Sequence, residues 1–340
     1  MCESEATSNL RFMTIINTSV VAEKNLTEIF HWALKIEIGV LFFSWIEFLY
    51  LFYLFLFIRA MHFNLNFLFM VYGGQYFCSM VARIFILYYQ LGYENLKDWL
   101  ILSNYVRTIA LVIAFNVLPI FMFERCVATF LVKNYEKSIK FHVPVIILLI
   151  FFPFCGISGF AYIQCWIPLT LLIAGFFVIN ITGYLGINSI RDFNVKRHRK
   201  FNTVTRKSSP YVLSERFQLA ENIKMLDILK KVQISILFFN VASTSILLMD
   251  YFRIDPIILY TSYMIYNYFL ALYAITVPII LHASLPEWKK ETKRLILKIR
   301  GKNAVGVCPR NTFGKQMIYT NPKEEADIYF TQFDSVLNKV

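Results

Sequence analysis

Two arginines lie inside long apolar segments of the chain, where a charge is costly and therefore a candidate for function. Arg83 lies about two-thirds of the way along the segment 67–91, and Arg107 lies near the start of the segment 101–123. A guanidinium in such a place attracts an anionic or carbonyl group, so both residues are predicted to line a ligand pocket. The alternative interpretation is structural, because each arginine could pair with an acid in another apolar segment, such as Glu37.

Further polar side chains occur near the ends of apolar segments and could line the same pocket. Tyr105 follows the start of its segment by one turn, Tyr263 and Tyr266 lie on the last apolar segment, and Asp250 ends the segment before it. Tyrosine near a membrane boundary often anchors a helix at the interface instead. Pocket lining and interface anchoring therefore both remain open for these tyrosines.

Patterns typical of catalysis and metal binding are missing from the sequence. The five histidines show no HExxH spacing, and neither a GxSxG stretch nor a phosphate-binding glycine loop occurs. The six cysteines have no metal-ligand spacing. We therefore expect no enzyme activity, no metal site and no cofactor.

The elements that must hold these side chains are apolar segments of membrane-crossing length. Apolar residues make up 57% of the 340 residues, against about 45–50% in soluble domains. A helix needs about 20 apolar residues to cross roughly 30 Å of hydrocarbon. We predict an all-α bundle of seven transmembrane helices. The seven segments are 36–58, 67–91, 101–123, 143–162, 167–190, 232–252 and 257–282.

Basic residues are distributed unevenly between the two sides of these spans. Most of the 34 lysines and arginines fall in the loops 124–142 and 191–231 and after residue 282, which lie on one side. Cytoplasmic loops carry such an excess. We therefore expect the N-terminus outside, and we attribute the net charge of +12 to the inner membrane face rather than to a nucleic-acid partner.

This topology divides the chain into three predicted parts. Residues 1–35 form an extracellular segment, 36–282 form the helical domain, and 283–340 form a cytoplasmic tail. The sequons at Asn17 and Asn25 lie in the first part, and both are predicted N-glycosylation sites.

Two amphipathic stretches are predicted on the inner side. Residues 191–210 are interpreted as a charged loop, and 211–231 as a helix that extends the sixth span inward. After the seventh span, 285–300 is predicted to be an amphipathic helix with Trp288 opposite its lysines, lying in the inner membrane interface.

Several motifs occur in the order found in one receptor family. They are Phe123–Thr129 followed by Asn134–Lys137, then Tyr211–Gln218 with Glu221-Asn222, and Asp327–Phe333 near the C-terminus. The chain resembles the nematode serpentine receptors of class epsilon, the Sre chemoreceptors, over roughly residues 30–333.

The resemblance implies a seven-helix receptor in the plasma membrane or cilia of chemosensory neurons. Such a receptor is expected to detect an external small molecule and to signal through a heterotrimeric G protein. Glu124 and Arg125 match the acid–arginine switch of many G protein-coupled receptors, although Arg125 could simply reach lipid phosphates. Departures from rhodopsin-like receptors are plain, since no Asn-Pro-x-x-Tyr follows in the seventh span and Cys165 lacks the usual partner cysteine at the third span.

A ligand-gated channel subunit or a transporter is the alternative function. Seven spans and the lack of an internal repeat fit a transporter of inverted repeats poorly. A channel with its N-terminus inside would leave Asn17 and Asn25 unglycosylated, so the two topologies are distinguishable.

Overall fold

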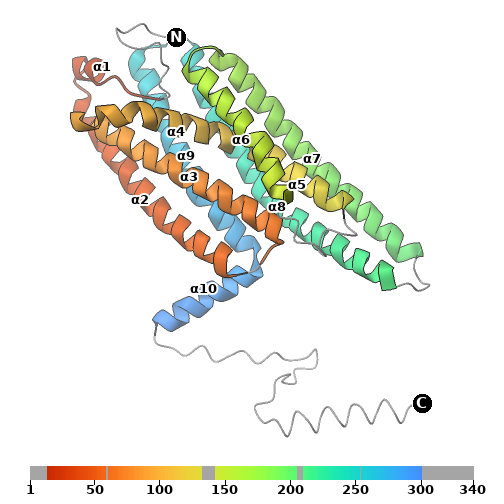
Figure 1. Ribbon diagram of the computed structural model, residues 1–340. Helices are drawn as coiled ribbons and strands as arrows, with labels where there is room; N and C mark the ends of the chain where they lie inside the picture. The colour runs from red at the N-terminus through yellow and green to blue at the C-terminus, as the bar shows by residue number, and fades with distance from the viewer. Residues whose placement is uncertain (1–13, 59, 132–141, 205–209, 253, 301–340) are drawn as a thin grey trace, which may run out of the picture. The chain divides into compact units, whose positions relative to one another are not determined.

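The computed structural model describes residues 14–58, 60–131, 142–204, 210–252 and 254–300, and its regular elements are all helices (Figure 1). In chain order they are α1 (Thr18–Glu23), α2 (Thr27–Phe57), α3 (Phe63–Gln90), η1 (Glu94–Leu96), α4 (Lys97–Phe115), α5 (Val117–Phe130), α6 (His142–Ile163), α7 (Leu169–Val204), α8 (Pro210–Leu247), η2 (Leu248–Tyr251), α9 (Pro256–Ser284) and α10 (Pro286–Ile299).

Seven of these helices are long and apolar enough to cross a membrane, which confirms the predicted seven-helix bundle. Many large apolar side chains on them remain exposed, among them Phe42, Phe43, Leu49 and Phe57 on α2 alone. A water-soluble monomer rarely exposes a contiguous apolar surface of this extent. The chain is therefore a multi-pass membrane protein whose exposed helix faces contact lipid.

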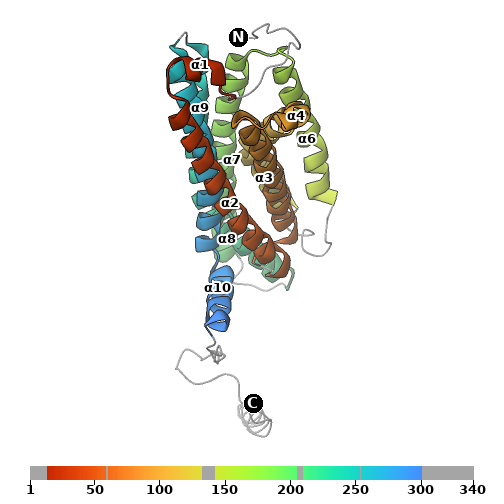
Figure 2. The ribbon, with the colours of Figure 1, turned by 90° about the vertical axis from the view of Figure 1, so that its left-hand side faces the viewer.

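The bundle has two ends, which we name by the start of α2. At the N-terminal face α2 begins, and short connections join α3 to α4, α6 to α7 and α8 to α9. At the opposite face α2 connects to α3, and α5 and α7 end (Figures 1 and 2). The predicted orientation makes the N-terminal face extracellular.

The third predicted span is broken into α4 and α5 at Asn116. Pro119 lacks a backbone N–H and so leaves the carbonyl of Phe115, four residues earlier, without its helical partner. The side chain of Asn180 on α7 donates to that carbonyl at 3.0 Å. Asn180 in turn accepts from Asn240 Nδ2 on α8 at 2.7 Å. Asn180 and Asn240 therefore tie the break to α7 and α8.

Helices α7 and α8 extend well beyond the predicted spans at the opposite face. The prediction of a helix over 211–231 is confirmed, because α8 runs without interruption from Pro210 to Leu247. The interpretation of 191–210 as a loop is wrong for 191–204, which continue α7. A charged sequence makes a good helix surface as well as a loop, and hydropathy alone does not distinguish the two.

The seventh span is followed by α10, as predicted for 285–300. The chain divides into two compact units after Trp288, so the remainder of α10 is described by itself. Within the first unit Trp288 is fully buried and its ring meets that of Phe55 edge-on at 4.9 Å. Trp288 is therefore a packing residue of the bundle rather than the interface anchor that its sequence position suggested.

Candidate functional site

Arg83 on α3 forms a buried ion pair with Glu37 on α2. Its Nε and Nη2 atoms donate to the two carboxylate oxygens at 2.6 and 2.8 Å, and both side chains are at most 4% exposed. This fork-to-fork geometry is the strongest that an arginine makes with a carboxylate. The main contact of Arg83 is therefore the ion pair with Glu37 that was the alternative to pocket lining. Its Nη1 is buried without a hydrogen bond among the described residues.

Arg107 on α4 is buried but has no acid within ion-pair distance in the described part of the chain. Its Nη2 donates to Asn267 Oδ1 on α9, and its Nη1 has no described acceptor. Tyr266, next to Asn267 in the sequence and within electrostatic range of Arg107, is also fully buried with an unbonded hydroxyl. Asn267 Nδ2 is unbonded as well. Arg107, Tyr266 and Asn267 thus form a polar cluster, which we call the Arg107 cluster.

The unsatisfied atoms of the Arg107 cluster are an N–H of Arg107, an NH₂ of Asn267 and the hydroxyl of Tyr266, all of which donate hydrogen bonds. Leaving a buried donor unbonded costs about 1–3 kcal/mol, and more for a charged group. The cluster has the surplus positive charge of Arg107, because Glu37 is engaged by Arg83. The cluster is therefore suited to bind a ligand group that accepts hydrogen bonds, preferably an anionic one.

The cluster and the neighbouring ion pair lie at a similar depth. Glu37, Arg107 and Asn267 are each about ten residues from the helix end at the N-terminal face, and Arg83 is seven residues from it. A rise of 1.5 Å per residue places them roughly 10–17 Å below that face. The two groups are close enough to interact electrostatically. A binding site here would lie in the half of the bundle predicted to face outward.

The remaining predicted pocket residues lie in two other contacts. Tyr105 accepts a hydrogen bond from Gln164 at 2.7 Å and stacks on Phe160, so it joins α4 to the end of α6. Tyr263 donates to Asp250 at 2.5 Å, which joins α9 to η2 at the N-terminal face. The six predicted residues are thus not one constellation. Asn267 was missed, although a buried amide within the seventh span was a signal that could have found it.

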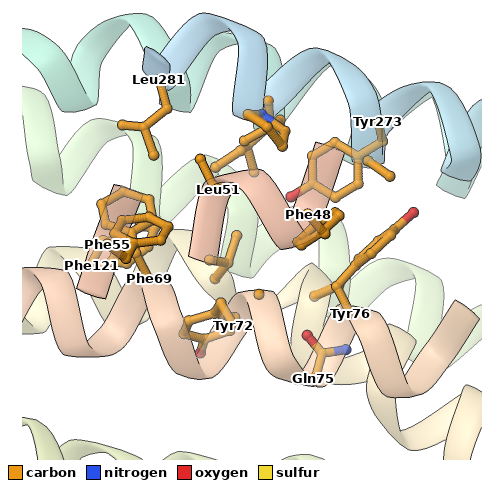
Figure 3. Close-up of a pocket in the computed structure, with 17 residues that line it drawn as sticks. Phe48, Leu51, Phe55, Phe69, Tyr72, Gln75, Tyr76, Phe121, Tyr273 and Leu281 are labelled. Carbon is orange, nitrogen blue, oxygen red and sulfur yellow. The ribbon is translucent and has the colours of Figure 1, made fainter. Parts of the chain in front are cut away.

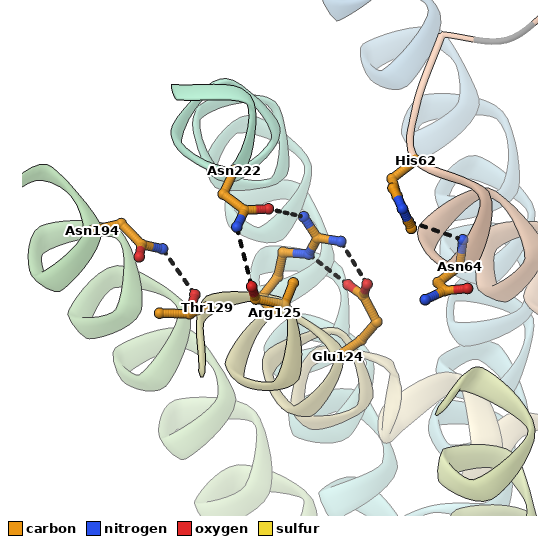
Figure 4. Close-up of polar contacts among 8 residues, drawn as sticks. His62, Asn64, Glu124, Arg125, Thr129, Asn194 and Asn222 are labelled. Atoms are coloured by element: carbon orange, nitrogen blue, oxygen red, sulfur yellow. Dashed lines mark hydrogen bonds and ion pairs between the residues drawn. The ribbon is translucent and has the colours of Figure 1, made fainter. Parts of the chain in front are cut away.

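At the opposite end of the bundle, Glu124 and Arg125 form a pair on α5 (Figure 4). Two hydrogen bonds of 2.5 Å join the guanidinium to the carboxylate, and both side chains are essentially fully buried. Arg125 Nη1 also meets Asn222 Oδ1 on α8 at 3.5 Å, and Asn222 Nδ2 donates to the Ala128 carbonyl at 3.3 Å. Asn222 thereby fastens α8 to α5 directly at the arginine.

Two more contacts surround this pair. Thr129, one turn after Arg125, accepts from Asn194 on α7 at 2.9 Å. His62 precedes α3 and caps it by accepting from the Asn64 backbone at 3.3 Å. Burial lowers the pKa of His62, the charge of Arg125 lowers it further, and Glu124 opposes with a smaller effect. Polar contacts to α7 and α8 therefore flank the pair, and His62 before α3 lies within its electrostatic range.

The predicted glycosylation residues are both exposed near the N-terminal face. Asn17 caps α1 and accepts from Ser19 N at 3.0 Å, and Asn25 occupies the turn between α1 and α2 with φ +56°. Cys165, in the connection between α6 and α7, is disulfide-bonded, although the comparison with rhodopsin-like receptors left it without its usual partner.

Comparison with known proteins decides the family. A family model described as "Sre G protein-coupled chemoreceptor" matches residues 2–337. The chain belongs to the Sre family. Serpentine receptor class epsilon-8 of Caenorhabditis elegans is 56% identical over 340 residues, which cover 98% of this chain and 99% of the relative. Serpentine receptor class epsilon-12 of the same organism is 27% identical over 287 residues, covering 78% of this chain and 82% of the relative.

Membership in the Sre family confirms the resemblance drawn from the ordered motifs, and it identifies a chemoreceptor class of G protein-coupled receptor. Two of the residues that carried the resemblance, Arg125 and Asn222, meet in space although 97 residues separate them. The relatives are named as receptors rather than as enzymes.

The Glu37–Arg83 pair of this Sre receptor generates a stability prediction. Glu37→Gln should leave the Arg83 charge buried without its counter-ion, which costs about 3–5 kcal/mol. We expect a loss of folded receptor, measured as monodisperse protein in size-exclusion chromatography and as a lower unfolding midpoint. Glu47→Gln on the same helix is the control, because Glu47 has no described ion pair. Equal behaviour of the two variants would contradict a structural role for the pair.

Proposed function

We propose that this Sre receptor detects an external small molecule at the Arg107 cluster and signals through a heterotrimeric G protein. The observation that supports the signalling half most directly is the buried Glu124–Arg125 pair held to α8 by Asn222. An arginine held by its acid and by a neighbouring helix is the arrangement expected of a receptor at rest.

The ligand half of the proposal depends on the unfilled donors of the Arg107 cluster. A ligand that supplies acceptor oxygens to Arg107 and Asn267 would bridge α4 and α9, which those residues already connect. A ligand shifts a conformational equilibrium only if it binds one state more tightly than the other. The active state is then one in which α4 and α9 close on the ligand.

The second step takes place at the opposite face. In the active state the end of α8 near Asn222 moves away from α5, which breaks the Asn222 contacts with Arg125 and Ala128. Arg125 is then free to leave Glu124 and to contact the G protein together with the first turns of α8. Buried contacts that are few and weak, as a 3.5 Å hydrogen bond is, make this opening thermally accessible.

The proposal includes an orientation and a location. We place the N-terminal face outside the plasma membrane of chemosensory neurons, with N-linked glycans on Asn17 and Asn25. Glycosidase treatment should reduce the mass of the wild-type chain and leave an Asn17→Gln/Asn25→Gln chain unchanged. A wild-type chain from animal cells that carries no glycan would count against this orientation.

The resting network generates a prediction that needs no ligand. Asn222→Ala should raise ligand-independent signalling severalfold, because it removes the side chain that joins α8 to Arg125. Addition of Arg125→Ala should return the signal to background, since the arginine is then missing from the open state. The measurement is second-messenger output in cells that express a promiscuous G protein, normalised to surface receptor.

Asn188→Ala is the matched control, because Asn188 lies on α7 and donates to its own helix at Tyr184. Unchanged basal signalling in Asn222→Ala, at equal surface expression, would contradict the proposed resting state.

A ligand screen in the same cells tests whether the Arg107 cluster binds the ligand. For any compound that activates the wild type, Arg107→Leu should weaken the response at least tenfold, because one charged hydrogen bond contributes about 1.5–3 kcal/mol. The raised ligand-independent signalling of Asn222→Ala should be unchanged in the double variant Asn222→Ala/Arg107→Leu. Failure of Arg107→Leu to shift the dose-response curve would remove the Arg107 cluster as the ligand site while leaving the signalling proposal intact.

A further inference from the structure

A separate cavity lies in the middle of the bundle, and none of the residues predicted to bind ligand lines it (Figure 3). Its volume is about 80 Å³. Side chains of α2, α3, α4, α5, α8 and α9 form its walls. Representative lining residues are Phe48, Phe69, Gln75, Phe121, Ile236 and Tyr273.

The walls of this cavity are uncharged and mostly aromatic or aliphatic. Gln75 uses its amide N–H group on the Ala110 carbonyl, and Tyr76 uses its hydroxyl on the Leu270 carbonyl. The Tyr273 hydroxyl points toward Phe48 in Figure 3. Tyr72 also lines the cavity, and its hydroxyl is buried without a hydrogen-bond partner among the described residues. A cavity with such walls is a poor site for water, which needs two to four polar partners.

The position of the cavity connects both halves of the receptor. Tyr76 lines it on one side and is also within electrostatic range of Arg107. Phe121 lines it on the other side, one helical turn before Arg125 on α5. Ile236 contributes a wall from α8, the helix that Asn222 fastens. Any molecule inside would therefore contact the elements that the proposed activation step moves apart.

We propose that this cavity is a binding site for a small, neutral, largely apolar molecule of about the size of a benzene derivative. Apolar cavities of roughly 150 Å³ in a protein core bind benzene. The present cavity is smaller, so its occupant fits after modest shifts of the lining side chains. A charged molecule is excluded, because the walls offer no counter-ion and burial of an isolated charge is prohibitively costly.

The site goes beyond the proposed ligand recognition at the Arg107 cluster and does not rest on it. The Arg107 cluster has surplus positive charge and favours an anionic ligand. The cavity has uncharged walls and favours a neutral, apolar one. Two probes of nearly equal shape therefore separate them. Toluene should bind the cavity, whereas benzoate should not.

The test uses the full chain in lipid nanodiscs and follows its thermal unfolding with each probe. Toluene should raise the unfolding midpoint of the wild type by several degrees relative to Ala274→Leu, because a ligand that binds only the folded state stabilises it. Ala274 is a buried lining residue on α9, and the larger side chain fills the cavity. Ala174→Leu on the exposed face of α7 is the matched control and should keep the wild-type response.

If Ala274→Leu does not fold, Ala114→Val on the α4 wall replaces it. Equal toluene shifts in the wild type, the cavity-filling variant and the control would show an effect on the lipid alone and would overturn the proposal. A benzoate shift that disappears in the cavity-filling variant would overturn it too. Arg107→Leu should leave the toluene shift unchanged. The test of the cavity is therefore independent of whether the Arg107 cluster binds the ligand.

Discussion

The rest of the structure depends on one constraint: a polar group inside the hydrocarbon region must find its partner within the bundle. Pro119 releases the Phe115 carbonyl in the middle of the third span, and Asn180 on another helix satisfies it. Glu37 satisfies Arg83 across two helices in the same way. Each such contact fixes the register of one helix against another, which apolar packing between similar side chains does only weakly. The polar residues buried between the spans therefore help to fix how the helices pack.

Some buried polar groups in the bundle lack the partner that this constraint requires. Arg107 keeps an unbonded N–H and a charge without a counter-ion in the described structure, and its neighbours Tyr266 and Asn267 also keep unbonded donors. Arg83 also keeps one unbonded N–H, but its charge has the carboxylate of Glu37 as a partner, whereas the charge of Arg107 has none in the described part of the chain. At the other end, Arg125 pairs with its own neighbour Glu124, and its contact to Asn222 crosses from α5 to α8. We expect the Arg107 cluster to bind a ligand, and we expect Arg125 to separate from Asn222 on activation.

Much of the architecture could be predicted from the sequence because its physical cause is local. Twenty apolar residues in a row predict a span wherever they fold, and an apolar stripe predicted the inward helix before the sixth span and the helix after the seventh. The break at Asn116 could not be predicted so directly, because a proline in a membrane helix is tolerated whenever a neighbour such as Asn180 satisfies the released carbonyl. The helical continuation through 191–204 was missed because charge density does not distinguish a helix from a loop.

The candidate sites show the same division. Arg83 and Arg107 were identifiable because a charge in an apolar segment stands out by composition. The Glu124–Arg125 pair, at the inner end of its span, was identified by its match to the acid–arginine switch of other receptors. Their partners were harder to find. Asn267 and Asn222 are ordinary amides in the sequence, and only the packing of α9 and α8 brings them to the arginines.

We propose that Asn222 holds α8 against α5 in the resting receptor. Distances between spin labels at Phe130 on α5 and Lys224 on α8, both exposed, test this most directly in nanodiscs without ligand. If Asn222 holds the two helices together, the distance distribution should be longer and broader in Asn222→Ala than in the wild type, and unchanged in Asn188→Ala. Identical distributions in all three chains would contradict it.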